Sequence, residues 1–328
     1  MNKDEIQLTK ALIKLKAIKK IIDILQDLNL LENDENMKDY NIILDYYKFD
    51  EDDFTTFNVK VNAKSLGKYN LICDKSLLNF NFKLKDENSG FALFKIIREY
   101  FVMKNDLKFP SFQKNYNSQY NGLKYLKHEV ETNHHVSLTS MIHTKKDEEK
   151  LTKFNKDIFN KYKTYIRKIH TVDFDKDEIQ TLKAEKKKEI AFAVIDMLKE
   201  LSNSNDNDKS YEIFMNYESF NECYIFKIQI LKNNKSLPLN INFKLKDKSK
   251  GIQMLNDIVK YYIENTDIMF DGYSNKDNHN ENINYSIIGQ NRVNLSYIIP
   301  SIYSKESIIY FKNLIKAKNE TKILEKAK

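Results

Sequence analysis

The sequence is poor in glycine, proline and cysteine, and it has no long apolar run. Six Gly and three Pro in 328 residues mean that turns must depend on Asn, Asp and Ser, whose side chains bond to their own backbone. Two cysteines, Cys73 and Cys223, are too few for a disulfide framework, so we expect a reducing compartment.

The sequence also lacks the segments that would direct it into or across a membrane. No stretch approaches the roughly 20 apolar residues of a membrane span. The N-terminus begins with Asp4 and Glu5 and lacks the apolar core of a signal peptide. We therefore expect a cytoplasmic protein, with export by a leaderless route as the open alternative.

The charge balance is only mildly basic. Lys and Arg number 54 and Asp and Glu number 47, which gives a net charge of +7. This charge permits a nucleic acid or another anionic partner but requires neither. The length exceeds the usual limit of a single hydrophobic core, so we expect two domains.

One segment of the chain returns nearly unchanged. Residues 78–86 read LNFNFKLKD and residues 239–247 read LNINFKLKD, so eight of nine positions agree. Further matches follow in the same order, and their offset drifts from 173 near the start to 157 near the end, as small loop insertions would produce. A period of this length indicates two copies of a whole domain. We predict modules at residues 1–172 and 173–328.

Apolar spacing predicts an α+β fold in both halves. Helical periodicity occupies residues 5–31, 90–104, 145–169, 178–202, 251–264 and 304–325. Strand-like segments lie near residues 40–48, 54–62, 68–73, 78–85, 135–143, 211–218, 222–231, 238–246, 284–288 and 292–299. Residues 105–133 give no clear pattern. Each module is therefore expected to hold a mostly antiparallel sheet flanked by an N-terminal, a middle and a long C-terminal helix.

The junctions between the repeated strand and the following helix each contain one glycine. They read Asp86-x-x-x-Gly90 and Asp247-x-x-x-Gly251. A helix N-terminus attracts anions, but a phosphate loop needs further glycines that are not present. We favour a tight turn or a close approach of helix and sheet at each glycine.

A histidine-rich stretch, His128 to His135, suggests a metal site. A zinc-binding His-Glu-x-x-His motif would need histidine at position 132, where Thr132 stands. We interpret these histidines as surface residues and predict neither a metal site nor a cofactor. There is also no Gly-x-Ser-x-Gly motif, and both cysteines lie in strand-like segments. We therefore predict no catalytic residue and a protein that is not an enzyme.

Two features favour a polyanionic partner. The first is a basic region around the joint between the modules, and the second is an aromatic loop whose rings could stack on unpaired bases. The candidate nucleic-acid-binding residues are Lys150, Lys153, Lys161, Arg167, Lys168, Lys183, Lys186, Lys187, Lys188, Tyr116, Tyr120 and Tyr125. A solvated lysine face is the alternative interpretation, and arginine, the preferred reader of phosphate and guanine, is rare.

The pattern of apolar residues recurs in both halves of the chain. No set of polar residues that could carry out chemistry recurs with it. We therefore predict a non-enzymatic protein that binds another protein, as a scaffold, structural subunit or inhibitor, with aromatic side chains as interface anchors. Nucleic-acid binding through the basic region is the alternative prediction.

Overall fold

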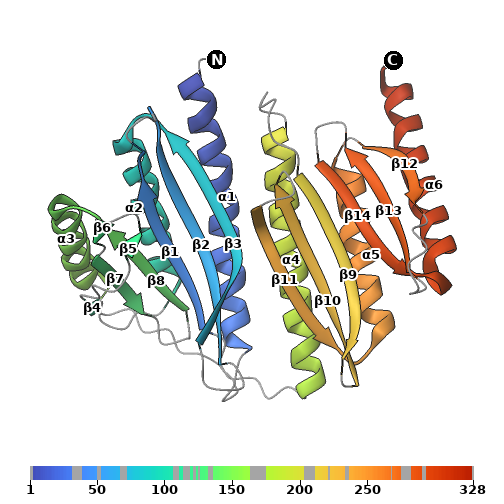
Figure 1. Cartoon of the computed structure of the whole chain (residues 1–328), viewed down its shortest axis with the longest axis horizontal. Coiled ribbons are helices and arrows are strands. Elements are labelled where there is room, and N and C mark those ends of the chain that lie inside the picture. Colours follow the sequence, from blue (N-terminus) through green and yellow to red (C-terminus); the bar gives the residue numbers. More distant parts are fainter. Residues whose placement is uncertain are drawn as a thin grey trace. The chain divides into compact units, whose positions relative to one another are not determined.

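The protein is a mixed α+β protein that divides into two compact units, Met1–Phe174 (unit 1) and Asp175–Lys328 (unit 2) (Figure 1). The computed structural model describes residues 3–31, 39–49, 53–66, 72–105, 111–113, 119–120, 123–124, 126–131, 136–162, 175–202, 211–220, 222–232, 236–266, 268–274, 282–289 and 293–326. None of the helices in these ranges is long and apolar enough to cross a membrane.

Unit 1 begins with a long helix and a three-stranded meander. The elements are α1 (Lys3–Leu30), β1 (Asp39–Tyr47), β2 (Thr55–Leu66), β3 (Ile72–Leu84), α2 (Glu87–Lys104), β4 (Ser111–Gln113), β5 (Gln119–Tyr120), β6 (Leu123–Lys124), β7 (Leu126–Glu131), β8 (Val136–Ile142) and α3 (Lys145–Tyr162). The strand order is β3-β2-β1-β8-β7-β4, and β5 pairs with β6 separately. Strand β1 is parallel to β8 and antiparallel to β2, so the sheet is mostly antiparallel.

Unit 2 has a similar order of elements. They are α4 (Lys176–Ser202), β9 (Tyr211–Phe220), β10 (Cys223–Lys232), β11 (Ser236–Leu245), α5 (Lys248–Asn265), β12 (Ile268–Ser274), β13 (Asn282–Gly289), β14 (Val293–Pro300) and α6 (Ser301–Lys326). The strand order is β11-β10-β9-β14-β13-β12. Here β9 is parallel to β14, and the other pairs are antiparallel.

The core of each unit lies between one face of its sheet and its helices. Figure 1 shows α1 and α2 side by side behind the strands of unit 1, and α4 and α5 behind those of unit 2. On β3, Phe80 and Phe82 are buried while Asn81 and Lys83 are exposed, which confirms the predicted one-sided sheet.

Both junction glycines lie against an aromatic ring of the sheet. A Cβ atom on Gly90 would lie 2.0 Å from the Cζ atom of Phe57, and one on Gly251 would lie 1.9 Å from that of Phe226. No side chain fits at such a distance, so glycine lets the helix approach the sheet. The predicted close approach of helix and sheet is therefore confirmed. Asp86 caps α2 by accepting the backbone N–H groups of residues 88 and 89, each at 3.1 Å.

The middle helix of each unit is tied to the first helix by a tyrosine. Tyr100 donates its hydroxyl to Asp23 at 2.6 Å, and Tyr261 donates to Asp196 at 2.6 Å. Burial and these carboxylates raise the pKa of each tyrosine to about 12. Both hydroxyls therefore stay protonated and serve as donors between the helices.

Several predicted boundaries differ from the structure. The separate strand near 68–73 is wrong in its described part, because Ile72 and Cys73 belong to a single strand with residues 78–84 that bends at a register shift. The polar residues Asp74, Lys75 and Ser76 interrupt the apolar pattern within that strand. Residues 105–133 contain the short strands β4 to β7, and β12 was not predicted. The predicted helix 145–169 is described only as far as Tyr162.

Candidate binding pocket

Unit 1 contains a cavity of about 580 Å³ between α2 and α3, which we call the α2–α3 pocket. Its walls are the two helices, and Tyr46 of β1 and Met141 of β8 contribute from the sheet. A volume of this size is in the range of ligand-binding pockets. Such a pocket can hold a small molecule or a few apolar side chains of a partner.

The lining is mainly apolar and aromatic. It includes Phe91, Ala92, Phe94, Val102, Leu151, Phe154 and Ile158. Val102, Phe154 and Ile158 form a buried cluster that joins the two helices, whereas Phe91 is only half-buried and Ala92 is exposed. This cluster packs α2 against α3 beside the pocket.

Cationic side chains surround this apolar lining. Five cations and three carboxylates line the pocket: Lys95, Arg98, Lys150, Lys153 and Lys161, with Glu99, Asp147 and Asp157. Lys95 and Glu99 form an ion pair with 3.8 Å between Nζ and Oε1. The Nζ atom of Lys150 lies 4.3 Å from the centre of the Phe91 ring, a cation–π contact. Because the cations outnumber the carboxylates, the net positive charge of the lining favours an anionic occupant.

Arg98 brings a positive charge among the apolar residues of the pocket. It extends from α2, half-buried, and its Nε donates to Ser140 Oγ at 3.0 Å. Its guanidinium carbon lies 5.8 Å from the centre of the Phe94 ring. Burial lowers the pKa of Arg98 to about 10, and the negative charge of Asp147 acts in the opposite direction. Arg98 therefore remains a cation at neutral pH.

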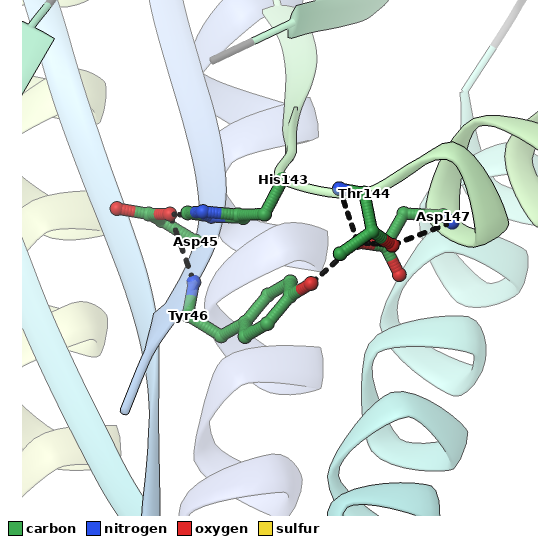
Figure 2. Close-up of polar contacts among 5 residues, drawn as sticks. All are labelled: Asp45, Tyr46, His143, Thr144 and Asp147. Carbon is green, nitrogen blue, oxygen red and sulfur yellow. Dashed lines mark hydrogen bonds and ion pairs between the residues drawn. The ribbon is translucent and has the colours of Figure 1, made fainter. Parts of the chain in front are cut away.

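A hydrogen-bonded network fixes the first turn of α3 beside the pocket (Figure 2). Asp147 Oδ2 accepts from the backbone N–H of Thr144 at 3.1 Å and from its hydroxyl at 2.8 Å. The backbone N–H of Asp147 donates in return to Thr144 Oγ1 at 3.2 Å. These reciprocal bonds form a capping box with aspartate in place of glutamate. The carboxylate of Asp147 therefore has a structural role.

Tyr46 joins strand β1 to this network. Its hydroxyl donates to Asp147 Oδ2. Burial and the hydrogen bond to Asp147 raise the pKa of Tyr46 well above its usual range. A tyrosine that keeps its proton in this way is a hydrogen-bond donor, and it is unsuited to act as a base or nucleophile at neutral pH.

The neighbouring residue, Asp45, holds the end of β8. His143 Nε2 donates to Asp45 Oδ1 at 2.8 Å, and the backbone N–H of Tyr46 donates to the same oxygen at 2.9 Å. Figure 2 shows His143 and Asp45 beside Tyr46, with Thr144 following His143 into α3. This pair secures the connection between β8 and α3.

His128 is buried on β7, where only 1% of its surface is exposed, so the predicted surface position is wrong for this histidine. Its Nε2 lies 2.8 Å from Asn155 Oδ1 of α3. Burial lowers the pKa of His128 to about 4, and the charge of Arg98 acts in the same direction. A neutral His128 therefore joins the sheet to α3. His134 and His135 lie outside the described residues.

The structure separates the predicted nucleic-acid-binding residues into two groups. Lys150, Lys153 and Lys161 are exposed on α3 of unit 1. Lys183, Lys186, Lys187 and Lys188 are half-buried on α4 of unit 2. Tyr116, Tyr125, Arg167 and Lys168 lie outside the described residues, and for Tyr120 only the backbone is described.

Three of the α4 lysines have partners within unit 2. Lys186 pairs with Glu189 at 3.2 Å, Lys188 Nζ lies 3.0 Å from Asp257 Oδ2, and Lys187 donates to the backbone oxygen of residue 242 at 2.8 Å. The contacts of Lys187 and Lys188 join α4 to β11 and α5, whereas the Lys186 pair lies within α4.

The described residues hold no group of three or more His, Cys, Asp or Glu side chains placed to bind a metal ion. Cys223 begins β10 and is half-buried. Cys73 is described only by its backbone in β3.

The sequence prediction missed Arg98, which we consider the main polar residue of the pocket. A signal was present: Arg98 follows Phe94 by four residues and therefore shares the face of α2 that carries Phe94. Counted from the N-cap Asp247, the corresponding position in α5 is the fully buried Val259. Comparisons of the chain with protein families, characterised proteins and solved structures find no match.

Proposed function

We propose that this protein works by binding another protein, and that the α2–α3 pocket of unit 1 receives an apolar segment of the partner. The observation that supports this proposal is an aromatic pocket between α2 and α3, beside the buried cluster of Val102, Phe154 and Ile158 that joins the two helices. Grooves of this kind accept amphipathic helices through apolar side chains one helical turn apart.

The polar groups around the pocket favour binding over catalysis. Tyr46 keeps its proton, and Asp147 is used in the helix cap and in the bond to Tyr46. Ser140 accepts a hydrogen bond from Arg98. A hydrolytic or acid–base site would need a nucleophile and a base aimed at one reacting atom, and these side chains have other roles.

Selection of short random peptides displayed on phage tests this proposal with the full-length chain as the target. The variant Ala92→Trp places an indole in the pocket from an exposed position on α2, and Ala317→Trp makes the same change on an exposed position of α6. We expect clones that bind the wild type and Ala317→Trp but not Ala92→Trp.

Two results would contradict the proposal. The first is an absence of enriched clones, or enriched clones that bind Ala92→Trp as well as the wild type. The second is saturable binding of an amphipathic small molecule, such as dodecanoate, by a chain that selects no peptide, because the pocket would then hold a small ligand.

A nucleic-acid partner remains the second candidate, and the exposed lysines of α3 favour it. Lys145, Lys146, Lys150, Lys153, Lys156 and Lys161 are all exposed on that helix. Affinity for single-stranded RNA or DNA should then fall steeply with added salt, and Lys146→Glu with Lys156→Glu should weaken it. No retardation in a low-salt gel shift would reject this candidate.

We also propose that the two units are tandem copies of one module. The support lies in equivalent details: each sheet has one parallel pair at the same place, and each middle helix has an aspartate cap, a glycine against a phenylalanine and a tyrosine bonded to the first helix. An experimentally determined structure whose two units could not be superimposed would refute duplication.

A further inference from the structure

We propose that Arg98 binds a carboxylate of the partner, so that the α2–α3 pocket selects an acidic side chain placed between apolar anchors. This inference rests on the proposed function and names the chemistry of the bound segment. It concerns a protein segment with Asp or Glu flanked by residues such as Leu, Met and Phe.

The first reason is the bonding of Arg98 itself. Among the described residues, its hydrogen bond runs from Nε to Ser140 Oγ, and its other contact is with the Phe94 ring. The two terminal Nη groups therefore have no carboxylate or carbonyl acceptor in the described part of the chain. A part-buried guanidinium without acceptors is unfavourable. A carboxylate of a ligand would accept two parallel hydrogen bonds from these groups.

The second reason is that the neighbouring carboxylates leave this position open. The negative charge of Asp147 opposes the larger effect of burial, which lowers the pKa of Arg98, but the Oδ2 atom of Asp147 accepts from Tyr46 and Thr144. Glu99 is paired with Lys95, and Asp157 is exposed on α3. Asp147 therefore lies near Arg98 without occupying its terminal groups.

The third reason is the distribution of the remaining charge. Lys150 and Lys153 are exposed on the α3 side of the pocket, and Lys153 has no ion-pair partner among the described residues. Arg98 would hold one carboxylate within the pocket, while these lysines attract further acidic residues of the segment. The apolar side chains of the lining lower the local polarity around such a contact and so strengthen it.

A designed phage library tests the inference on the full-length chain. Each peptide carries apolar residues drawn from Leu, Met and Phe around a central position that is Asp, Glu, Asn or Gln at equal frequency. On the wild type we expect the acids to be enriched about tenfold over the amides at that position, as a charge-assisted hydrogen bond would produce. On Arg98→Met the preference should disappear, and Arg98→Lys should retain part of it.

A control separates recognition from a structural role of Arg98. Ser140→Ala removes the internal hydrogen bond of Arg98 but leaves its charge, so the preference for acids should persist in this variant. Equal loss of the preference in Ser140→Ala and Arg98→Met would overturn the inference.

The library also distinguishes failure of the inference from failure of the proposed function. Enrichment that is lost in Ala92→Trp but shows no preference between acid and amide would reject the role of Arg98 and leave peptide binding in place. No enrichment on the wild type would reject both.

Discussion

At the scale of single residues, the close packing of a glycine against a ring determines how near α2 can approach its sheet. The Phe57 ring is fully buried, stacked on Phe82 at 5.6 Å and edge-on to Phe94 at 5.2 Å. A ring held on several sides cannot move aside for an added methyl group.

The variant Gly90→Ala should therefore destabilise the protein by about 2–3 kcal/mol, measured by urea denaturation. The sign of this change in stability is informative, because alanine in an unobstructed helix position is more stable than glycine by about 1 kcal/mol. The double variant with Phe57→Leu should recover part of the loss. Stabilisation by Gly90→Ala alone would show that the helix and sheet are not in this contact.

A second residue-scale prediction concerns acid stability and His128. Its pKa is about 4 in the folded protein and near 6.5 when unfolded. The unfolded chain thus binds more protons between these values, so stability is retained above pH 6.5 and is lost as the pH falls toward 4. As the pH falls through this window, the free energy of unfolding of His128→Gln should rise relative to that of the wild type by up to about 3 kcal/mol. The free energy of unfolding is measured for both proteins at each pH. A pH-independent difference would contradict the burial of a neutral imidazole.

At the scale of elements, α3 depends on its capping box and on Tyr46. Thr144→Ala removes one side-chain cap and should cost about 1 kcal/mol. Asp147→Ala also leaves the half-buried Tyr46 hydroxyl without its acceptor, so it should cost about 2–3 kcal/mol. Thermal denaturation of both variants, with Tyr46→Phe in a double-mutant cycle, checks this order. Equal costs for Thr144→Ala and Asp147→Ala would argue against the bond to Tyr46.

Most of the regular elements could be predicted from the sequence, because their side chains obey a single period. Strand β3 shows alternation from Leu78 to Leu84, and both middle helices follow an aspartate cap and carry a glycine in their first turn. The failures have physical causes. The first residues of β3 include Asp74, Lys75 and Ser76, whose polarity suggests a turn.

The pocket could not be predicted because it depends on tertiary neighbours. Tyr46, Arg98 and Asp147 are far apart in the sequence, and only the pairing of β1 with β8 and the packing of α3 bring them together. The predicted lysines of α3 do line the pocket, but Lys186, Lys187 and Lys188 of α4 have partners that a charge count cannot reveal.

At the scale of the whole molecule, each unit has its own buried core. In unit 1, residues such as Ile42, Phe57 and Ile97 are fully buried, and in unit 2 Ile213, Phe226 and Ile258 are. Residues 1–174 and residues 175–328 should therefore each fold when expressed alone. Circular dichroism should report a cooperative thermal transition for each fragment. Two fragments without such transitions would show that neither core is sufficient.

The difference between the units is the reason to place binding in unit 1. Twelve residues after the helix cap, α2 carries Arg98 and α5 carries the buried Val259. If the two units are copies of one module, this difference is a change of chemistry on a retained framework. We therefore expect the acidic partner segment at α2 and α3, and not at α5 and α6.

Hydrogen–deuterium exchange of the full-length chain with an acidic peptide from the library tests the central claim most directly. The peptide should slow exchange of the amides in α2 and α3 of the wild type, leave α5 and α6 unchanged, and have no effect on Ala92→Trp. Protection confined to α4 or to unit 2, or protection that persists in Ala92→Trp, would contradict the assignment of the α2–α3 pocket as the binding site.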